Sequence, residues 1–146
     1  MSLFHLLSVS ASGMAAQRAR AELLTENLAN AETTRTPEGG PYRRKDAVFT
    51  SDATTSPFSA VFQEALGPNV TGVRVSEVIE DKGAPIMRYM PGHPDADEKG
   101  YVAFPNINPA EDMVDLMGAS RGYQANVSAM TAVKDMIHKS LDLLRG

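Results

Sequence analysis

Apolar and small residues follow a regular pattern along the N-terminal part of the chain. Between Leu3 and Ala31 they recur at steps that alternate between four and three residues. An average period of about 3.5 residues is typical of a helix that winds around partner helices. No proline interrupts the segment, so we expect one long helix. Its predicted seam comprises Leu3, Leu7, Ser10, Met14, Gln17, Ala21, Leu24, Leu28 and Ala31.

The last third of the chain repeats this pattern behind a strong helix-start signal. In the sequence Asn108-Pro109-Ala110-Glu111, the asparagine can cap a helix, and proline suits the first helical position. Lys134 is the charged exception in the seam, a type of residue that can set register or partner number. The second predicted seam comprises Met113, Leu116, Ser120, Tyr123, Val127, Met130, Lys134, Ile137, Leu141 and Leu144.

Both predicted helices are rich in alanine, serine and glycine, and their apolar surface is not confined to one stripe. Small side chains let helix backbones approach closely. They also forfeit the large apolar burial, at roughly 25 cal/mol per Å², that would stabilise a two-helix hairpin alone. Since a helix that is apolar on more than one side needs several neighbours, we expect these helices to assemble with other subunits. We also expect their ends to fray in the isolated monomer.

The middle of the chain has a different character. A turn-rich loop over residues 36–41 is followed by segments of alternating or apolar residues. We expect strands over 42–49, 73–79, 85–89 and 101–104, with Lys82-Gly83 turning the second strand into the third. We expect a polar linker over residues 50–57, and beyond this the structure of residues 50–66 is not predicted. The predicted fold is mainly α with a β-rich insert: helical segments at 1–34 and 108–146, and a small, partly irregular middle domain at 35–107.

Composition narrows the classes of function. The 146 residues carry a formal net charge of -4, which argues against a nucleic-acid binder, because such proteins need a clustered cationic surface. Without cysteine, no disulfide or thiolate metal site can form. The apolar N-terminus lacks the cationic region of a signal peptide, and no window approaches the roughly 20 apolar residues of a membrane span. We therefore expect an uncleaved N-terminus and no direct membrane insertion.

One acidic stretch resembles a cation site. Asp95 and Asp97 with Gly100 imitate the opening of a calcium-binding loop. The resemblance then fails, because Lys99 and Asn106 occupy the positions of later ligands, and we interpret the stretch as a solvated turn. Nowhere else can a nucleophile, a base and an orienting group be assembled. We predict no catalytic site, no cofactor and no metal.

Several motifs together resemble the flagellar basal-body rod proteins, particularly those of the proximal rod. Each motif is moderately specific, but their order and spacing along the chain make the resemblance strong. It implies a structural subunit whose terminal helices pair as a coiled coil lining a periplasmic rod, with the insert packed outside. The motifs are Glu26–Ala31, Pro41–Lys45 with Phe49, Gly100–Ala103, Pro105–Pro109, Met113–Met117 and Ala119–Asn126.

The resemblance also implies partners. These are copies of the same chain, other flagellar rod proteins, proteins at the junction with the MS ring, and the flagellar type III export apparatus. Export by that apparatus requires no cleaved signal peptide. The alternative function is a soluble coiled-coil adaptor in the cytoplasm, and a small enzyme with its site in the insert is a weaker third possibility.

The residues expected at the assembly interface lie on the two seams and in the motifs beside them. For Asn27 and Asn30 two interpretations stay open: the amides bond across subunits and fix register, or they simply end the first helix. The full predicted interface is Leu3, Leu7, Met14, Leu24, Asn27, Leu28, Asn30, Met113, Leu116, Tyr123, Gln124, Asn126, Val127, Met130, Ile137 and Leu141.

Overall fold

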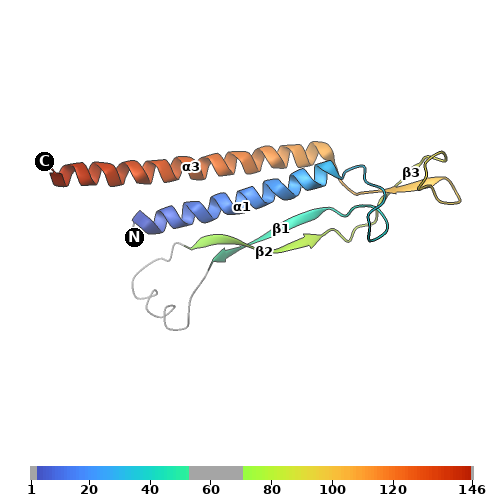
Figure 1. Cartoon of the computed structure of the whole chain (residues 1–146), viewed down its shortest axis with the longest axis horizontal. Coiled ribbons are helices and arrows are strands. Elements are labelled where there is room, and N and C mark those ends of the chain that lie inside the picture. Colours follow the sequence, from blue (N-terminus) through green and yellow to red (C-terminus); the bar gives the residue numbers. More distant parts are fainter. Residues whose placement is uncertain (1–2, 53–70, 146) are drawn as a thin grey trace, which may run out of the picture.

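A computed structural model describes residues 3–52 and 71–145 and shows an elongated molecule (Figure 1). Two long helices lie side by side, and the strands form two separate antiparallel ribbons. No helix within the described ranges is both long and apolar enough to cross a membrane. The elements in chain order are α1 (Leu3–Ala29), β1 (Lys45–Asp52), β2 (Gly72–Glu80), β3 (Ile86–Tyr89), β4 (Tyr101–Phe104) and α3 (Pro109–Arg145).

Helices α1 and α3 run antiparallel, and the C-terminal end of α3 extends past the start of α1 (Figure 1). Arg20 Nη2 lies 3.4 Å from Asp115 Oδ1 in the first part of α3. Farther along, Gly13 faces the side chain of Asn126. The start of α3 is where the sequence predicts it, because Asn108 Oδ1 accepts the N–H of Ala110 at 3.2 Å.

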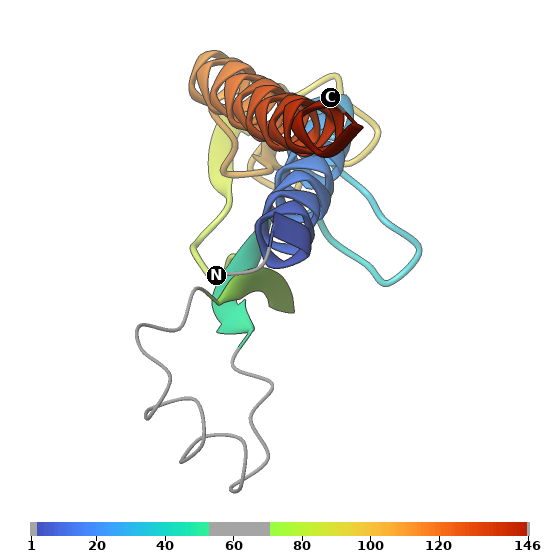
Figure 2. The same ribbon diagram turned by 90° about the vertical axis from the view of Figure 1, so that its left-hand side faces the viewer.

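Helix α1 lies between α3 and the ribbon of β1 and β2, as the two perpendicular views show (Figures 1 and 2). On the ribbon side, Ser12 Oγ accepts the N–H of Val73 at 3.0 Å and donates to the carbonyl of Val9 at 2.7 Å. On the other side, α1 packs against the small residues of α3. The sequence expectation that this helix needs more than one neighbour is met within the chain itself.

The strands lie close to their predicted positions, but one predicted connection is wrong. Lys82-Gly83 does not turn β2 into β3; β2 pairs with β1, and β3 pairs with β4. The Asp81 side chain caps the bend by accepting the N–H of Gly83 at 2.8 Å, and the chain then leaves the first ribbon. The expected polar linker over residues 50–57 is wrong at its start, because Thr50–Asp52 complete β1 by pairing with β2. The rest of that linker lies outside the described residues.

The most deeply buried side chains gather where the two helices meet the insert. Val102 and Phe104 of β4 and the nearby Ile107 are buried, together with Tyr42 before β1. Leu24, near the end of α1, is buried as well. We call this region the junction: the end of α1, residues 42–46, residues 102–107 and the first turn of α3. Its core forms only when the end of α1 and residues 42–46 meet residues 102–107 and the start of α3, which lie far away in the chain.

The covered face of α3 differs from the predicted seam by about one residue. Of that seam, Leu116, Met130 and Ile137 are half-buried, but Met113, Tyr123 and Leu141 are exposed. Small residues are covered in place of the large ones, because the two helices approach closely. The covered or half-covered positions of α3 are Asp112, Asp115, Leu116, Ala119, Gly122, Asn126, Met130, Val133 and Ile137.

Two glycines make the close approach possible, and each receives an amide side chain from the other helix. A Cβ on Gly13 would lie 2.7 Å from Oδ1 of Asn126, and a Cβ on Gly122 would lie 3.1 Å from Cδ of Gln17. The Asn126 amide is held in place because its Nδ2 donates to the carbonyl of Gly122 at 2.9 Å. These reciprocal contacts fix how α1 and α3 are aligned along their length.

Gly13→Ala should therefore destabilise the chain, by about 1–2 kcal/mol after the gain in helix propensity is included. Removing the opposing amide with Asn126→Ala should recover most of that loss in the double mutant. Gly118→Ala is the matched control, because no atom lies near its added methyl group, and it should stabilise by about 0.5–1 kcal/mol. Urea unfolding of the monomer measures the wild type, the two single variants, the double variant and the control. Simple additivity of the Gly13 and Asn126 substitutions would contradict the contact.

Candidate assembly interface

Asn27 fastens the end of α1 to the start of β1. Its side chain is fully buried, its Nδ2 donates to the carbonyl of Lys45 at 2.9 Å, and its Oδ1 accepts the N–H of Lys45 at 2.9 Å. The amide thus pairs with one backbone residue as a neighbouring β-strand would. We had expected this amide to bond across subunits or to end the helix. In the structure it instead fixes register between two elements of the same chain.

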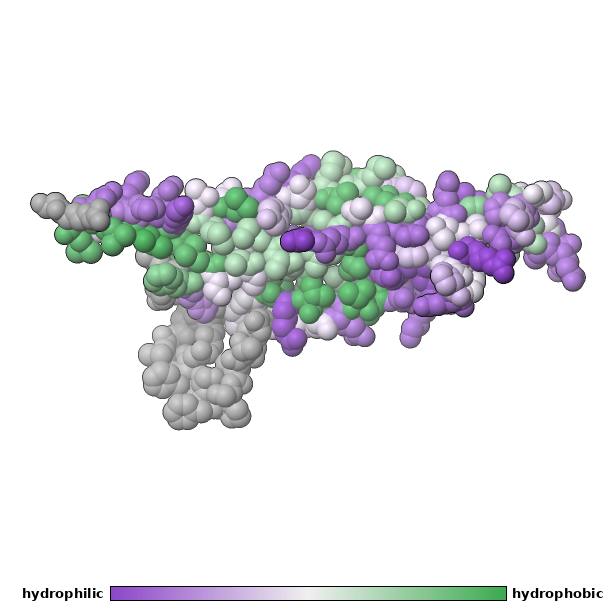
Figure 3. Space-filling model, in the orientation of Figure 1, coloured by the Kyte–Doolittle hydropathy of each residue, from purple (hydrophilic) through white to green (hydrophobic). Residues whose placement is uncertain are grey.

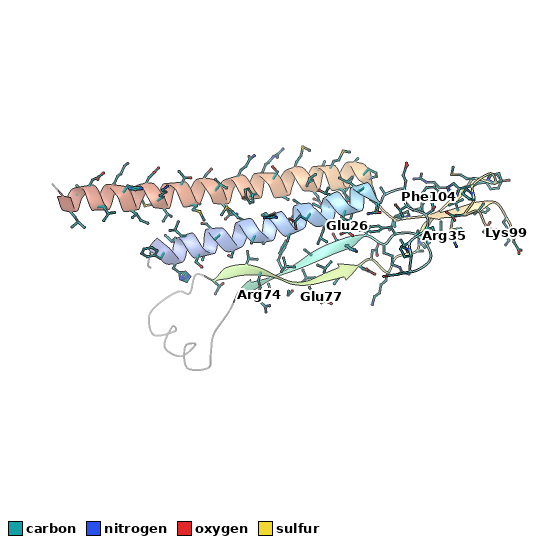
Figure 4. The ribbon with its side chains drawn as sticks, in the orientation of Figure 1. Glu26, Arg35, Arg74, Glu77, Lys99 and Phe104 are labelled. Atoms are coloured by element: carbon teal, nitrogen blue, oxygen red, sulfur yellow. The ribbon has the colours of Figure 1, made fainter. Side chains whose placement is uncertain are left out.

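Tyr42 completes this amide cluster. Its hydroxyl donates to Asn27 Oδ1 at 3.1 Å, and burial, with Glu26 nearby, raises the pKa of Tyr42 far above its usual value. The hydroxyl therefore stays a donor at any physiological pH. Outside the cluster, Lys45 Nζ lies 2.6 Å from Glu26 Oε1, which adds a half-exposed ion pair between the same elements. Figure 4 shows Glu26 on the last turns of α1, beside the start of β1.

Asn30 lies just beyond the last residue of α1 and supports the simpler of its two interpretations. Its Nδ2 donates to the carbonyl of Glu26 at 2.9 Å, and its Oδ1 accepts the hydroxyl of Thr33 at 3.1 Å. Both contacts are local and satisfy groups at the helix end. The side chain is half-buried, so part of it stays accessible to a neighbour.

A buried ion pair joins the insert to α3. Arg44 Nη2 lies 3.0 Å from Asp112 Oδ1, and the Asp112 side chain is only 1% exposed. Burial raises the pKa of Asp112, while the attraction of Arg44 opposes that rise. Transferring a charge from water into the protein interior costs free energy. This ion pair therefore serves mainly to orient the insert relative to α3 and adds little net stability.

The acidic stretch that imitates a calcium loop makes contacts with another segment of the chain and is not merely a solvated turn. Asp95 Oδ2 accepts the hydroxyl of Thr34 at 2.8 Å, and its other oxygen lies 3.6 Å from Arg35 Nη1. Asp97 Oδ1 accepts the N–H groups of Lys99 and Tyr101 and so closes its own turn. Within the described ranges, no group of three or more potential metal-binding side chains occurs. The stretch therefore ties the loop between β3 and β4 to the segment after α1.

The predicted interface residues fall into three groups in the structure. Leu24 and Asn27 are buried within the subunit. The side chain of Leu3 lies outside the described residues. The half-buried group is Leu7, Met14, Leu28, Asn30, Leu116, Asn126, Met130 and Ile137, and the exposed group is Met113, Tyr123, Gln124, Val127 and Leu141.

The apolar members of the exposed group, Met113, Tyr123, Val127 and Leu141, lie together with Met117 within about a third of the circumference of α3. We call this side of the helix the outer face; it is apolar near the start and the end of α3, and Lys134 interrupts it. The apolar side chains of the outer face are 41–56% exposed. Figure 3 shows hydrophobic side chains over the first part of α3 and along its C-terminal end. A groove of about 560 Å³ between α1 and α3 adjoins this face, with Ala21, Leu116 and Tyr123 in its lining. Exposed apolar patches of this kind are typical of surfaces that bind other proteins.

Sequence reasoning missed the residues that organise the junction. Tyr42 and Arg44 stand in the Pro41–Lys45 motif, but they and Asp112 act through partners that are distant in the chain, and the sequence pattern assigned them no structural role. The only available signal was Asp112 itself, a carboxylate on the covered side of an otherwise small or apolar helix face. Such a residue is almost never fully buried unless it is paired.

The Asn27 amide cluster gives a sharp test of the junction. Asn27→Ala leaves the Lys45 backbone groups and the Tyr42 hydroxyl without a buried partner and should cost roughly 3 kcal/mol. Tyr42→Phe removes one hydrogen bond of the three and should cost about 1 kcal/mol. Urea unfolding of the monomer provides both values. If Asn27→Ala costs no more than Tyr42→Phe, the amide does not organise the junction.

Comparison with known proteins identifies the family. Residues 98–143 match the model of the flagellar basal body rod FlgEFG protein C-terminal family. The flagellar basal-body rod protein FlgC of Borreliella burgdorferi is 39% identical over 152 residues, with 100% of both chains covered. FlgC of Bacillus subtilis is 41% identical and FlgC of Salmonella typhimurium 40%, each over 98% of this chain and at least 98% of its own length. The chain therefore belongs to the FlgC family of flagellar basal-body rod proteins, which are structural and not catalytic subunits.

Proposed function

We propose that this rod subunit polymerises through the outer face of α3, and that the terminal helices form a coiled-coil inner layer of the periplasmic rod. The observation that carries the proposal is the exposure of Met113, Tyr123 and Val127 on a helix whose other side is already covered. The predicted seam of α3 is offset by about one residue from the face that α1 covers. Helix α3 therefore has two sides that can pack against other helices. One side binds α1, and the other is free for neighbouring subunits.

Burial of the outer face would supply much of the free energy of assembly. Each of its large apolar side chains, once fully covered, contributes on the order of 1.5–3 kcal/mol relative to exposure, and the half-exposed ones contribute a part of that. Because every subunit of a polymer repeats the contact, a modest gain per side chain becomes large for the assembly. The groove beside Tyr123 offers further apolar surface next to the same face.

Helix α1 has a smaller free side. Its exposed positions recur along one stripe that begins with Phe4, which is 76% exposed, and continues through Ser8, Ala11 and Ala15. Farther along, Arg18 and Glu22 pair with each other at 2.8 Å and make the stripe polar. Only the N-terminal half of α1 is therefore suited to close contact with an apolar neighbour. We assign this stripe to the assembly interface, together with the half-buried Leu7 and Met14 beside it. Leu3, whose side chain lies outside the described residues, stays a predicted member of the interface.

Under the same proposal, the chain divides into a rod core and an insert. Residues 1–34 and 108–146 form the rod core, and residues 35–107 form the insert on its outside. Partners are other copies, other rod proteins, the MS-ring junction proteins and the type III export apparatus, which moves the chain without cleavage of a signal peptide. Full-length relatives at about 40% identity favour this assignment over a cytoplasmic adaptor.

Val127→Asp tests the outer face without disturbing the monomer. Val127 is exposed in the single chain, so the variant should keep the helix content and urea midpoint of the wild type. In an assembly, the new carboxylate would be buried without a partner, which costs several kcal/mol per subunit and should abolish rod formation. Soft-agar motility and purification of basal bodies from the variant strain provide the measurement.

Ala125→Asp is the matched control, because Ala125 is exposed on another side of the same helix. It should allow more rod assembly than Val127→Asp. Normal rods in the Val127→Asp strain would refute the outer face as the interface. Equal loss in the two strains would place the interface elsewhere on α3.

A further inference from the structure

The guanidinium of Arg44 lies between two carboxylates that belong to different parts of the fold. Its Nη2 is 3.0 Å from Oδ1 of Asp112 on the first turn of α3. The same nitrogen is 3.6 Å from Oδ1 of Asp46 in β1. The two acids differ sharply in environment, since the Asp112 side chain is 1% exposed and that of Asp46 is 48% exposed. Arg44, which directly precedes β1, therefore has a buried partner on α3 and an exposed partner in β1.

The buried half of this arrangement is incomplete. Asp112 Oδ2 and Arg44 Nε are both buried, and neither has a hydrogen-bond partner. A bidentate arginine–carboxylate pair would have a second hydrogen bond, from Nε to Oδ2, in addition to the one from Nη2 to Oδ1. Arg44 thus contacts Asp112 through one nitrogen only. The other oxygen of Asp112 can accept a proton without first breaking a hydrogen bond.

The environment of Asp112 favours its protonated, neutral form. Burial raises the pKa of Asp112, and the nearby acids Asp46, Asp115 and Glu111 raise it further, while Arg44 lowers it. The cation Arg20, on α1, pairs with Asp115: its Nη2 lies 3.4 Å from Asp115 Oδ1. As the pH falls, Asp112 therefore becomes neutral before an aspartate of ordinary pKa does.

We propose that Arg44 is a two-position switch: at neutral pH it binds Asp112 and ties the insert to α3, and on acidification it moves to Asp46 and releases that tie. The proton comes from solvent and binds Asp112 Oδ2, so the carboxyl becomes neutral and Arg44 keeps its charge. Asp46 then becomes the stronger partner, because its carboxylate already lies 3.6 Å from the same nitrogen of Arg44. The insert is loosened from α3 while the positions of α1 and β1 stay fixed.

The rest of the junction survives the change. The Asn27 amide cluster and the apolar core of Val102, Phe104 and Ile107 do not depend on Asp112 being ionised. The folded chain also binds this proton more tightly than the unfolded chain, since its Asp112 pKa is the higher of the two. The contribution of Asp112 to stability is thus largest at low pH and is lost as the pH rises through the folded-state pKa. Protonation breaks one contact without favouring global unfolding.

Nuclear magnetic resonance of the full chain, kept dilute and monomeric, can follow both partners. The side-chain carboxyl carbon of Asp112 should titrate with a midpoint above about 3.9, the ordinary value for aspartate. The Nε signal of Arg44 should move with the same midpoint. In Asp112→Asn, which imitates the neutral carboxyl, the Arg44 signal should already have its acidic-pH position at neutral pH and should not move at that midpoint.

Two further variants separate the switch from a general charge effect. Asp46→Asn removes the second position, so the Asp112 midpoint should fall and Arg44 should no longer reach the acidic-pH position of the wild type. Asp115→Asn is the control, because it lowers the local negative charge but leaves both Arg44 partners in place; the shared titration should persist at a lower pH. An Arg44 signal that stays unchanged while wild-type Asp112 titrates would overturn the proposal, as would an Arg44 titration that persists in Asp112→Asn.

Discussion

The pairing of the Asn27 amide with the backbone of Lys45 is the contact on which the arrangement of this subunit depends. It fixes the end of α1 against the start of β1 and thereby sets the register of the first ribbon along the helix. It also places Arg44, the preceding residue, where it can reach Asp112 on α3. One buried amide thus orients both the insert and the second helix, and no large apolar core is needed at this point.

The pairing of the helices follows a different principle, since small residues and two amides meet where large apolar side chains would be expected. Gly13 and Gly122 allow the backbones to approach, and Asn126 and Gln17 fill the space beside them. This choice turns Met113, Tyr123 and Val127 outward. A subunit built in this way leaves several large apolar side chains of α3 exposed, and these are the side chains that the proposed contacts between subunits would cover.

The sequence predicted what local chemistry determines. The capping asparagine and proline located the start of α3, and the leucine period located α1 and its covered side. It misplaced the covered face of α3 by one residue, because periodicity favours large apolar residues and cannot register the close approach that glycine permits. It also joined β2 to β3 and treated Asp95 as solvated, since strand pairing and the Thr34 contact depend on segments that are distant in the chain.

Hydrogen exchange on the dilute wild-type monomer tests the central claim most directly, because it reports local stability along the whole chain. If the junction organises the fold, protection should be strongest in the last turns of α1, in residues 44–46 and 102–104, and in the first turns of α3. It should decline toward the start of α1 and be weakest beyond Ile137, where α3 extends past its partner. Uniformly strong protection from Leu7 to Leu28 in a proven monomer, or stronger protection at the C-terminal end of α3 than at the junction, would contradict the account.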